Sequence, residues 1–407
     1  MHHRGIVRVG ALLAAATLAL TACGSRGGDT GTGNTGGKVA KIGVISPLSG
    51  DLAAIGTGIR DSVALAIKQA NANKAVPGWT LQMEDLDDEA KPDTGKNAAT
   101  KLANDPAVVG VVGPLNSSVG QSVQPVLSAA NIAEISPANT NPTLTQGADW
   151  KTSKKRPYAN YFRTCTTDAV QGPFAARYVY NTLKFTKVAT VHDKKTYGQG
   201  LVETFTAEFK KLGGTVVSAQ TVNPDDKNYS SVISKIAPSK PQLLYFGGEY
   251  PTSGPLTQQM KAAGLNVPLM GGDGMYSADY LKLAGNAAPG NYATSVGAPL
   301  DQLPAAKQYI ADYKAGGYKG DNSSYGAYAF DAANAIIAAL KTSLANAADA
   351  KSAREATVKA LGSVSIDGVS GKVSFDQYGD TTNKTLTVYQ VDKSNAWKGV
   401  NTGEFKD

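Results

Sequence analysis

Residues 108–118 constrain the fold of this chain most strongly. The run Val108–Val112 is apolar, and Gly113-Pro114 breaks it before a group of small polar side chains and a helix-like pattern at residues 119–123. A short apolar run of this kind is typical of a strand buried in a parallel sheet. In open α/β sheets, ligands bind beyond the carboxyl ends of the strands, although a serine pair there can also be a simple helix cap. The polar residues at this strand end are Asn116, Ser117 and Ser118.

The same alternation of apolar run and helical spacing recurs on both sides of a basic stretch at residues 151–157, which we expect to be a surface insertion. Repeated strand–helix units predict parallel sheets covered on both faces, so two such series predict an α/β protein with two doubly wound lobes and a ligand cleft between them. A long helix is expected at 325–344, with antiparallel strands at 373–376 and 386–391. Strands of the two series are expected at 41–46, 81–86, 108–112, 132–135, 188–191, 216–219, 243–246 and 269–270.

The first residues predict export. Arg4 and Arg8 precede a short apolar stretch at residues 9–20, which is too short for a stable membrane span and is typical of a signal peptide over residues 1–22. The ending Leu20-Thr21-Ala22-Cys23 resembles a bacterial lipobox, which implies a lipid on Cys23 and attachment to the extracytoplasmic face of the membrane. The alternative is an ordinary cleavage site followed by a cysteine. The glycine-rich stretch to residue 38 predicts a flexible tether.

Composition disfavours several other functions. The net charge is +7, but the basic residues are dispersed among acidic ones, so a nucleic-acid partner is not expected. Cys165 is the only cysteine after Cys23 and is expected to be a packed residue without a disulfide. No metal or cofactor is expected, because His192 is isolated and the acids at 85–88 lack the spacing of a calcium loop.

Six motifs occur in order along the chain and together resemble the leucine/isoleucine/valine-binding proteins of ABC importers, from about Lys41 to the C-terminal strands. The motifs are Ser49-Gly50, Asp87-Asp88 with Pro92, Gly113-x-Leu-x-Ser117-Ser118, Ser136-Pro137-Ala138-x-Thr140-x-Pro142, Val191-His192-Asp193-Lys194 with Tyr197-Gly198, and Tyr245-x-Gly247-Gly248.

This resemblance implies a type I periplasmic-binding-protein fold whose two lobes are joined by three crossovers. Residues 39–165 and 295–378 are expected in lobe 1, and residues 166–294 and 379–407 in lobe 2. Transferred by position, the implied ligand contacts are Ser117 and Thr140 for the α-carboxylate and α-amino groups, with the main chain of Ala138. Tyr197 is the implied ligand contact from lobe 2, and Asp273 stands where the family usually has a glutamate that pairs with the ligand ammonium. Taken alone, Tyr197 could also be a packed helix-capping aromatic and Gly-Asp273-Gly an ordinary turn.

The chain departs from the family pattern at three places near the implied ligand. Ile55 stands where an aromatic wall residue is common, and Glu249 stands where a tyrosine is usual, with Tyr250 displaced by one position. Glu249 either lies near the ligand or points into solvent. The family's first-lobe disulfide is missing, with Ala90 and Asn116 at the corresponding positions.

The function expected from the sequence is that of a solute-binding protein that closes on a small amino acid, branched-chain or related, and delivers it to an ABC permease and ATPase. No bond is made or broken. One alternative is a ligand-sensing receptor subunit, and another is a different solute such as an amide, an aromatic acid or a polyamine. A serine hydrolase is disfavoured because only His192 remains after the signal peptide and no Gly-x-Ser-x-Gly motif is present.

Overall fold

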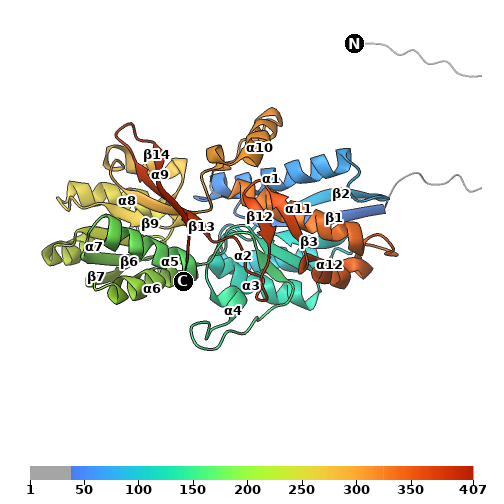
Figure 1. Ribbon diagram of the computed structural model, residues 1–407, viewed down its shortest axis with the longest axis horizontal. Coiled ribbons are helices and arrows are strands. Elements are labelled where there is room, and N and C mark those ends of the chain that lie inside the picture. The colour runs from blue at the N-terminus through green and yellow to red at the C-terminus, as the bar shows by residue number, and fades with distance from the viewer. Residues whose placement is uncertain (1–37, 324, 407) are drawn as a thin grey trace, which may run out of the picture. The chain divides into compact units, whose positions relative to one another are not determined.

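The computed structural model describes residues 38–323 and 325–406, and its helices and strands are drawn in Figure 1. The predicted signal peptide, Cys23 and all of the predicted tether except Lys38 lie outside the described residues. Within them, the chain forms two α/β lobes, each built on one sheet. The predicted fold class is confirmed.

The first sheet has five parallel strands in the order β2-β1-β3-β4-β5. Its central strand, β3, is the apolar run Val108–Val112, and all five of its residues are buried. The strands are β1 (Lys38–Ser46), β2 (Trp79–Asp87), β3 (Val108–Val112), β4 (Ala133–Ser136) and β5 (Tyr161–Arg163).

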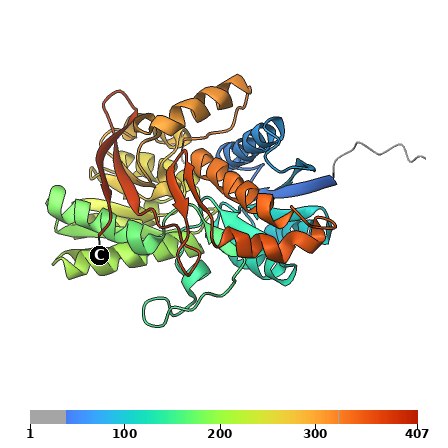
Figure 2. The ribbon, with the colours of Figure 1, turned by 45° about the vertical axis from the view of Figure 1, so that its right-hand side comes forward.

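Helices cover both faces of this sheet, as Figures 1 and 2 show. The side chains of β3 are divided between two apolar cores: Val109 and Val112 belong to one, and Val108 and Val111 to the other, with an irregular register against β1 at Val108–Gly110. The first core includes residues of α1 and α11, and the second includes residues of α2 and α3. The helices of this lobe are α1 (Ala53–Ala72), α2 (Pro92–Asn104), α3 (Ser117–Ala129), α4 (Thr143–Gln146), α10 (Pro304–Ala315), α11 (Gly326–Ser343) and α12 (Arg354–Leu361).

The second sheet has seven strands in the order β14-β13-β10-β9-β8-β6-β7. Five are parallel, while β13 runs antiparallel to both β10 and β14. The strands are β6 (Lys187–His192), β7 (Thr215–Thr221), β8 (Leu243–Gly247), β9 (Leu269–Gly271), β10 (Tyr292–Val296), β13 (Thr385–Val391) and β14 (Trp397–Glu404). Helices of this lobe are α5 (Asp168–Arg177), α6 (Thr196–Lys211), α7 (Ser230–Ile236), α8 (Tyr250–Ala262) and α9 (Ala278–Ala284).

The chain crosses between the lobes after β5, after β10 and before β13. The expected boundary between residues 294 and 295 falls inside β10, which lies wholly in the second sheet, so this crossover begins after Val296. A fully buried Arg163 joins the first and third crossovers, because its Nε donates to Asp380 Oδ1 at 2.6 Å and its Nη1 donates to the carbonyls of Asn139 and Asn141. This ion pair fixes the strand ends next to the cleft.

One expectation from the sequence is wrong. The predicted antiparallel strands near 373–376 and 386–391 do not pair with each other. Residues Gly371–Ser374 form β12, which pairs with β11 (Ser365–Gly368) in a hairpin, whereas β13 pairs with β10 and β14.

Candidate functional site

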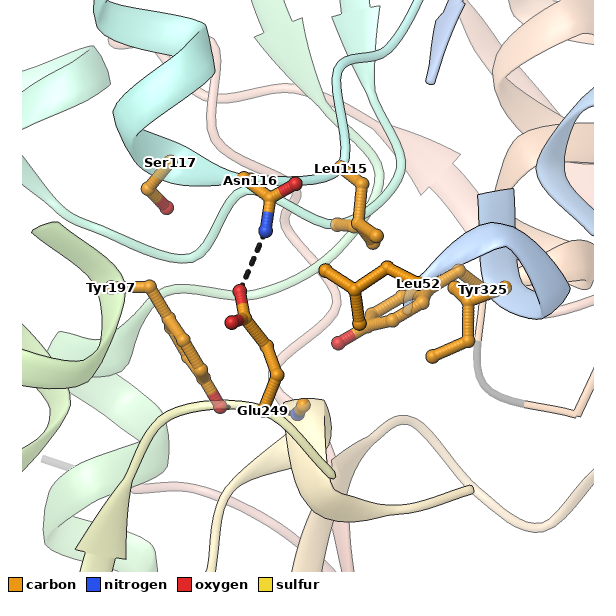
Figure 3. A pocket seen from close by; sticks show the side chains of 10 residues that line it. Leu52, Leu115, Asn116, Ser117, Tyr197, Glu249 and Tyr325 are labelled. Carbon is orange, nitrogen blue, oxygen red and sulfur yellow. Dashed lines mark hydrogen bonds between the residues drawn. The ribbon is translucent and has the colours of Figure 1, made fainter. Parts of the chain in front are cut away.

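A cavity of about 330 Å³ lies between the strand-end loops of the two lobes. Figure 3 shows its walls, with Leu52, Leu115, Asn116, Ser117 and Tyr325 from lobe 1 and Tyr197 and Glu249 from lobe 2. The lining residues are Leu52, Ile55, Leu115, Asn116, Ser117, Ala138, Tyr197, Glu249, Gly274 and Tyr325.

The N-terminus of α3 forms the polar part of the lobe 1 wall. The turn before it depends on Gly113, whose φ is +125° and whose position would bring a Cβ within 2.0 Å of the Ile45 carbonyl oxygen. Ser117 is the first residue of α3, and the side chain of Asn116 does not cap the helix. The first N–H groups of a helix have no intrahelical acceptor and suit a carboxylate. The Ser117 hydroxyl accepts a long bond from the Asn141 N–H at 3.4 Å and remains able to donate.

Apolar side chains form the rest of the lobe 1 wall. Leu52 and Ile55 come from the start of α1, Leu115 from the turn after β3, and Ala138 from the turn after β4. The Ala138 N–H donates to Ser136 Oγ at 3.2 Å, which holds this second turn against the end of its own strand. This wall is suited to an aliphatic or aromatic group of a ligand.

Asp273 lies behind two phenols of the cavity. Its Oδ1 accepts from the Tyr197 hydroxyl at 2.7 Å and from Gln171 Nε2 at 2.9 Å, and its Oδ2 accepts from the Tyr325 hydroxyl at 2.9 Å. Asp273 is only 1% exposed. Burial raises the pKa of its carboxyl, although the three hydrogen bonds oppose that effect. The carboxylate therefore orients Tyr197 and Tyr325, which come from different lobes.

Glu249 carries the carboxylate that lines the cavity itself. Its Oε1 accepts from Asn116 Nδ2 at 2.6 Å, and its Oε2 lies 2.9 Å from Lys195 Nζ. The side chain is 12% exposed, so the alternative in which Glu249 points into solvent is wrong. The charge of Glu249 raises the pKa of Lys195, and burial together with Glu249 raises the pKa of Asp193 to about 7.

Further hydrogen bonds join the lobes beside the cavity. The Tyr250 hydroxyl donates to the Asp51 carbonyl at 2.5 Å, and Asn141 Nδ2 donates to the Thr196 carbonyl at 2.8 Å. Thr196 Oγ1 donates to Gln121 Oε1 at 3.0 Å. Together with the bonds of Asn116 and Tyr325, they hold the two walls in contact around the cavity.

The structure brings together five of the residues predicted for the site and leaves four outside its lining. Ile55, Ser117, Ala138, Tyr197 and Glu249 line the cavity. The other four do not: Thr140 is fully buried, Ser118 lies in the first turn of α3, Asp273 lies behind Tyr197, and Tyr250 bridges the lobes through Asp51.

The ligand contacts predicted from the sequence did not include Leu52, Leu115, Gly274 or Tyr325. Asn116 was placed at the strand end where ligands bind and was also identified as the position of a missing family cysteine. Leu115 lies within a predicted strand-end turn, so its apolar character there was an available signal, and Leu52 follows the Ser49-Gly50 motif by two residues. Tyr325 had no such signal. It lies just before α11, far along the chain, and reaches the site only through the return of the chain into lobe 1.

Within the described part of the chain, no group of three or more His, Cys, Asp and Glu side chains is placed to hold a metal ion. None of the helices in that part has the length and apolar character needed to span a membrane.

Residues 39–396 match the family model described as periplasmic binding protein. The chain belongs to this family. It is therefore an extracytoplasmic solute-binding protein of the type I fold, and the relatives it matches are binding proteins rather than enzymes.

Individual relatives agree with this membership. The chain is 30% identical over 349 residues to the Leu/Ile/Val-binding protein BraC3 of Rhizobium johnstonii, covering 86% of this chain and 90% of that one. It is similar in fold to the branched-chain amino acid transporter substrate-binding protein LivJ of Streptococcus pneumoniae, solved with isoleucine, with a TM-score of 0.79, 23% identity and 90% and 100% coverage. It is also similar to an ABC-transporter solute-binding protein of R. palustris solved with benzoate, with a TM-score of 0.78, 19% identity and 90% and 97% coverage. At these identities, the two structures show the fold alone.

Proposed function

We propose that this protein binds a small amino acid, branched-chain or closely related, between its lobes and delivers it to an ABC permease. The observation that carries the proposal is the composition of the cavity: a helix N-terminus and a serine hydroxyl, an apolar wall and a carboxylate meet in a volume of about 330 Å³. An α-amino acid presents the three matching groups. The Leu/Ile/Val name of the R. johnstonii relative supports the same ligand class.

The lobe 1 wall is proposed to hold the ligand's α-carboxylate. The Ser117 hydroxyl and the free N–H groups at the start of α3 provide donors, and the main chain of Ala138 lies alongside. Leu52, Ile55 and Leu115 then face the ligand side chain. Thr140, which is buried beneath this wall, supports the second turn through its carbonyl, which accepts from the Asp168 N–H at 2.8 Å.

Closure of the lobes is the proposed mechanism. Tyr197 and Glu249 contact the ligand only when lobe 2 lies against lobe 1, so a ligand that touches both walls stabilises the closed state over the open one. The bonds from Tyr250 to Asp51 and from Asn141 to Thr196 form in the same closed arrangement.

Attachment to the membrane through a lipid on Cys23 is part of the proposal and is tested separately. We expect Cys23→Ala to release the protein into the medium of cells that otherwise retain it in the membrane fraction. Equal membrane retention of Cys23→Ala would contradict the lipid anchor and leave the binding proposal unaffected.

A thermal-shift screen of the mature protein against the twenty proteinogenic amino acids, followed by calorimetry, tests the ligand class. A ligand that binds the folded state raises the melting temperature, and we expect leucine, isoleucine or valine to give the largest rise. A rise with benzoate or a polyamine and with none of the amino acids would contradict the proposed ligand.

A further inference from the structure

The position of Glu249 results from a turn that only glycine allows. Gly248 has a φ of +152°, and a Cβ there would lie 3.0 Å from Asp193 Oδ2. Glu249 follows directly as the residue before α8, so its side chain leaves the end of β8 toward the cavity. Figure 3 shows its carboxylate between Tyr197 and Asn116, with the Asn116 amide nitrogen directed at it.

Asp273, which the family resemblance pairs with the ligand ammonium, is poorly placed for that contact. Its Oδ1 accepts from Tyr197 and Gln171, and its Oδ2 accepts from Tyr325. Asp273 does not line the cavity, whereas Tyr197 and Tyr325 do, so an ammonium group in the cavity would have to displace a phenol to reach it. Glu249, in contrast, lines the cavity, and each of its oxygens accepts one hydrogen bond and can accept another.

The charges around Glu249 leave room for one more cation. Among the described residues, Glu249 and Asp193 both lie beside Lys195: its Nζ lies 2.9 Å from Glu249, and its uncharged backbone N–H donates to Asp193 Oδ1 at 3.0 Å. Lys195 does not line the cavity, so it supports Glu249 from behind. A charge buried in a closed cleft is costly unless it is paired, and an ammonium group would balance this set.

Asn116 supplies a second acceptor beside Glu249. The residue is 4% exposed, and its Oδ1 has no hydrogen-bond partner within residues 38–323 and 325–406. A buried amide oxygen calls for a donor. Because Asn116 precedes Ser117, this acceptor adjoins the carboxylate site at the start of α3, as the ammonium and carboxylate of an α-amino acid adjoin each other.

We propose that Glu249, supported by Lys195 and Asn116, receives the α-ammonium group of the ligand, and that Asp273 acts only as a positioning residue for Tyr197 and Tyr325. This inference rests on the proposed function, since it requires an amino acid ligand. It makes Glu249, a position where the family pattern has tyrosine, the residue that distinguishes amino acids from ligands without an amino group.

The test compares two ligands that differ at one group: the amino acid that binds the wild type best among the twenty, and the 2-hydroxy acid with the same side chain. Calorimetry gives both dissociation constants for each variant. We expect Glu249→Gln to weaken binding of the amino acid about 10- to 100-fold and binding of the hydroxy acid less than about 3-fold, because only the ammonium loses a charged partner. Asp273→Asn should change the dissociation constants of both ligands by the same factor. Glu355→Gln, on the exposed surface of α12, removes one negative charge away from the cleft and serves as the matched control.

A second variant tests the same claim in the opposite direction. Lys195→Met frees Glu249 from its competing cation, so we expect the preference for the amino acid over the hydroxy acid to rise about 3- to 10-fold. The inference would be overturned if Glu249→Gln weakened the binding of both ligands equally, or if Asp273→Asn weakened the binding of the amino acid alone. Either result would leave the proposed amino acid function intact. Failure of the wild type to bind any amino acid would instead overturn the proposed function, and the inference with it.

Discussion

The two walls of the cavity differ in kind. Among the described residues, the lobe 1 wall contains no charged side chain: it consists of a helix N-terminus, small polar groups, apolar residues and Tyr325. The lobe 2 wall is polar and backed by charges, with Tyr197 and Glu249 in front and Asp193, Lys195 and Asp273 behind. From this difference we propose that lobe 1 recognises the shape and the carboxylate of the ligand, and that lobe 2 recognises its ammonium group.

Adding bulk to the lobe 1 wall should have the largest effect on ligand affinity. Ala138→Leu adds bulk to a small cavity without altering any charge, so we expect calorimetry to show losses of at least about 100-fold for the amino acid and its hydroxy acid alike. The melting temperature of the unliganded variant controls for misfolding. If the variant is folded and still binds with wild-type affinity, the ligand does not lie against this wall.

Removing the Ser117 hydroxyl from the lobe 1 wall should have the second largest effect on binding. Ser117→Ala deletes the hydroxyl that we propose donates to the ligand carboxylate. We expect affinity to fall about 10- to 100-fold, equally for the amino acid and the hydroxy acid, since both carry the carboxylate. Ser128→Ala, in the last turn of the same helix, is the matched control. A loss confined to the amino acid would mean that Ser117 faces the ammonium instead.

Tyr325→Phe should lower ligand affinity less than Ser117→Ala does. It removes a hydroxyl that reaches from lobe 1 to Asp273 but leaves the ring in the cavity wall. One cross-cleft hydrogen bond is lost, so we expect a 3- to 10-fold weakening of both ligands, measured by calorimetry. A change in the ratio of the two affinities would show that the phenol itself selects for the amino group.

The buried acid below the lobe 2 wall should affect stability rather than binding. Burial, together with Asp273, raises the pKa of Asp168 to about 8. The unfolded chain releases this proton near its ordinary pKa of about 4, so the stabilisation present in acid is lost as the pH rises from about 4 to about 8. We expect Asp168→Asn to reduce the fall in melting temperature between about pH 5.5 and about pH 8, corresponding to about 1–2 kcal/mol. If the melting temperature of Asp168→Asn falls with pH as steeply as that of the wild type, the pH dependence comes from other buried acids, such as Asp331.

Patterns along the chain predicted the lobe 1 wall better than the lobe 2 wall. The apolar run Val108–Val112, the glycine–proline break and Ser117 lie next to one another in sequence, so local rules placed that strand end correctly. Asp273 was predicted as a ligand contact from its position in the family pattern. Its burial depends on phenols 76 residues before it and 52 residues after it, Tyr197 and Tyr325, which no local pattern connects.

The orientation of Glu249 was undecided from sequence for the same reason. A glutamate at the end of a strand is usually solvated, and only the positions of Asn116, 133 residues away, and Lys195, 54 residues away, direct its carboxylate into the cavity. Contacts of this kind are formed by the packing of two lobes and cannot be inferred from periodicity.

A crystal structure of the mature protein with its best-binding amino acid tests the proposed roles of the two lobes most directly. We expect the ligand carboxylate to lie about 3 Å from Ser117 Oγ and the N–H groups of α3, and the ammonium to lie about 3 Å from the Glu249 carboxylate and Asn116 Oδ1. A ligand whose ammonium contacts Asp273, with Tyr197 or Tyr325 displaced and Glu249 turned away, would contradict it.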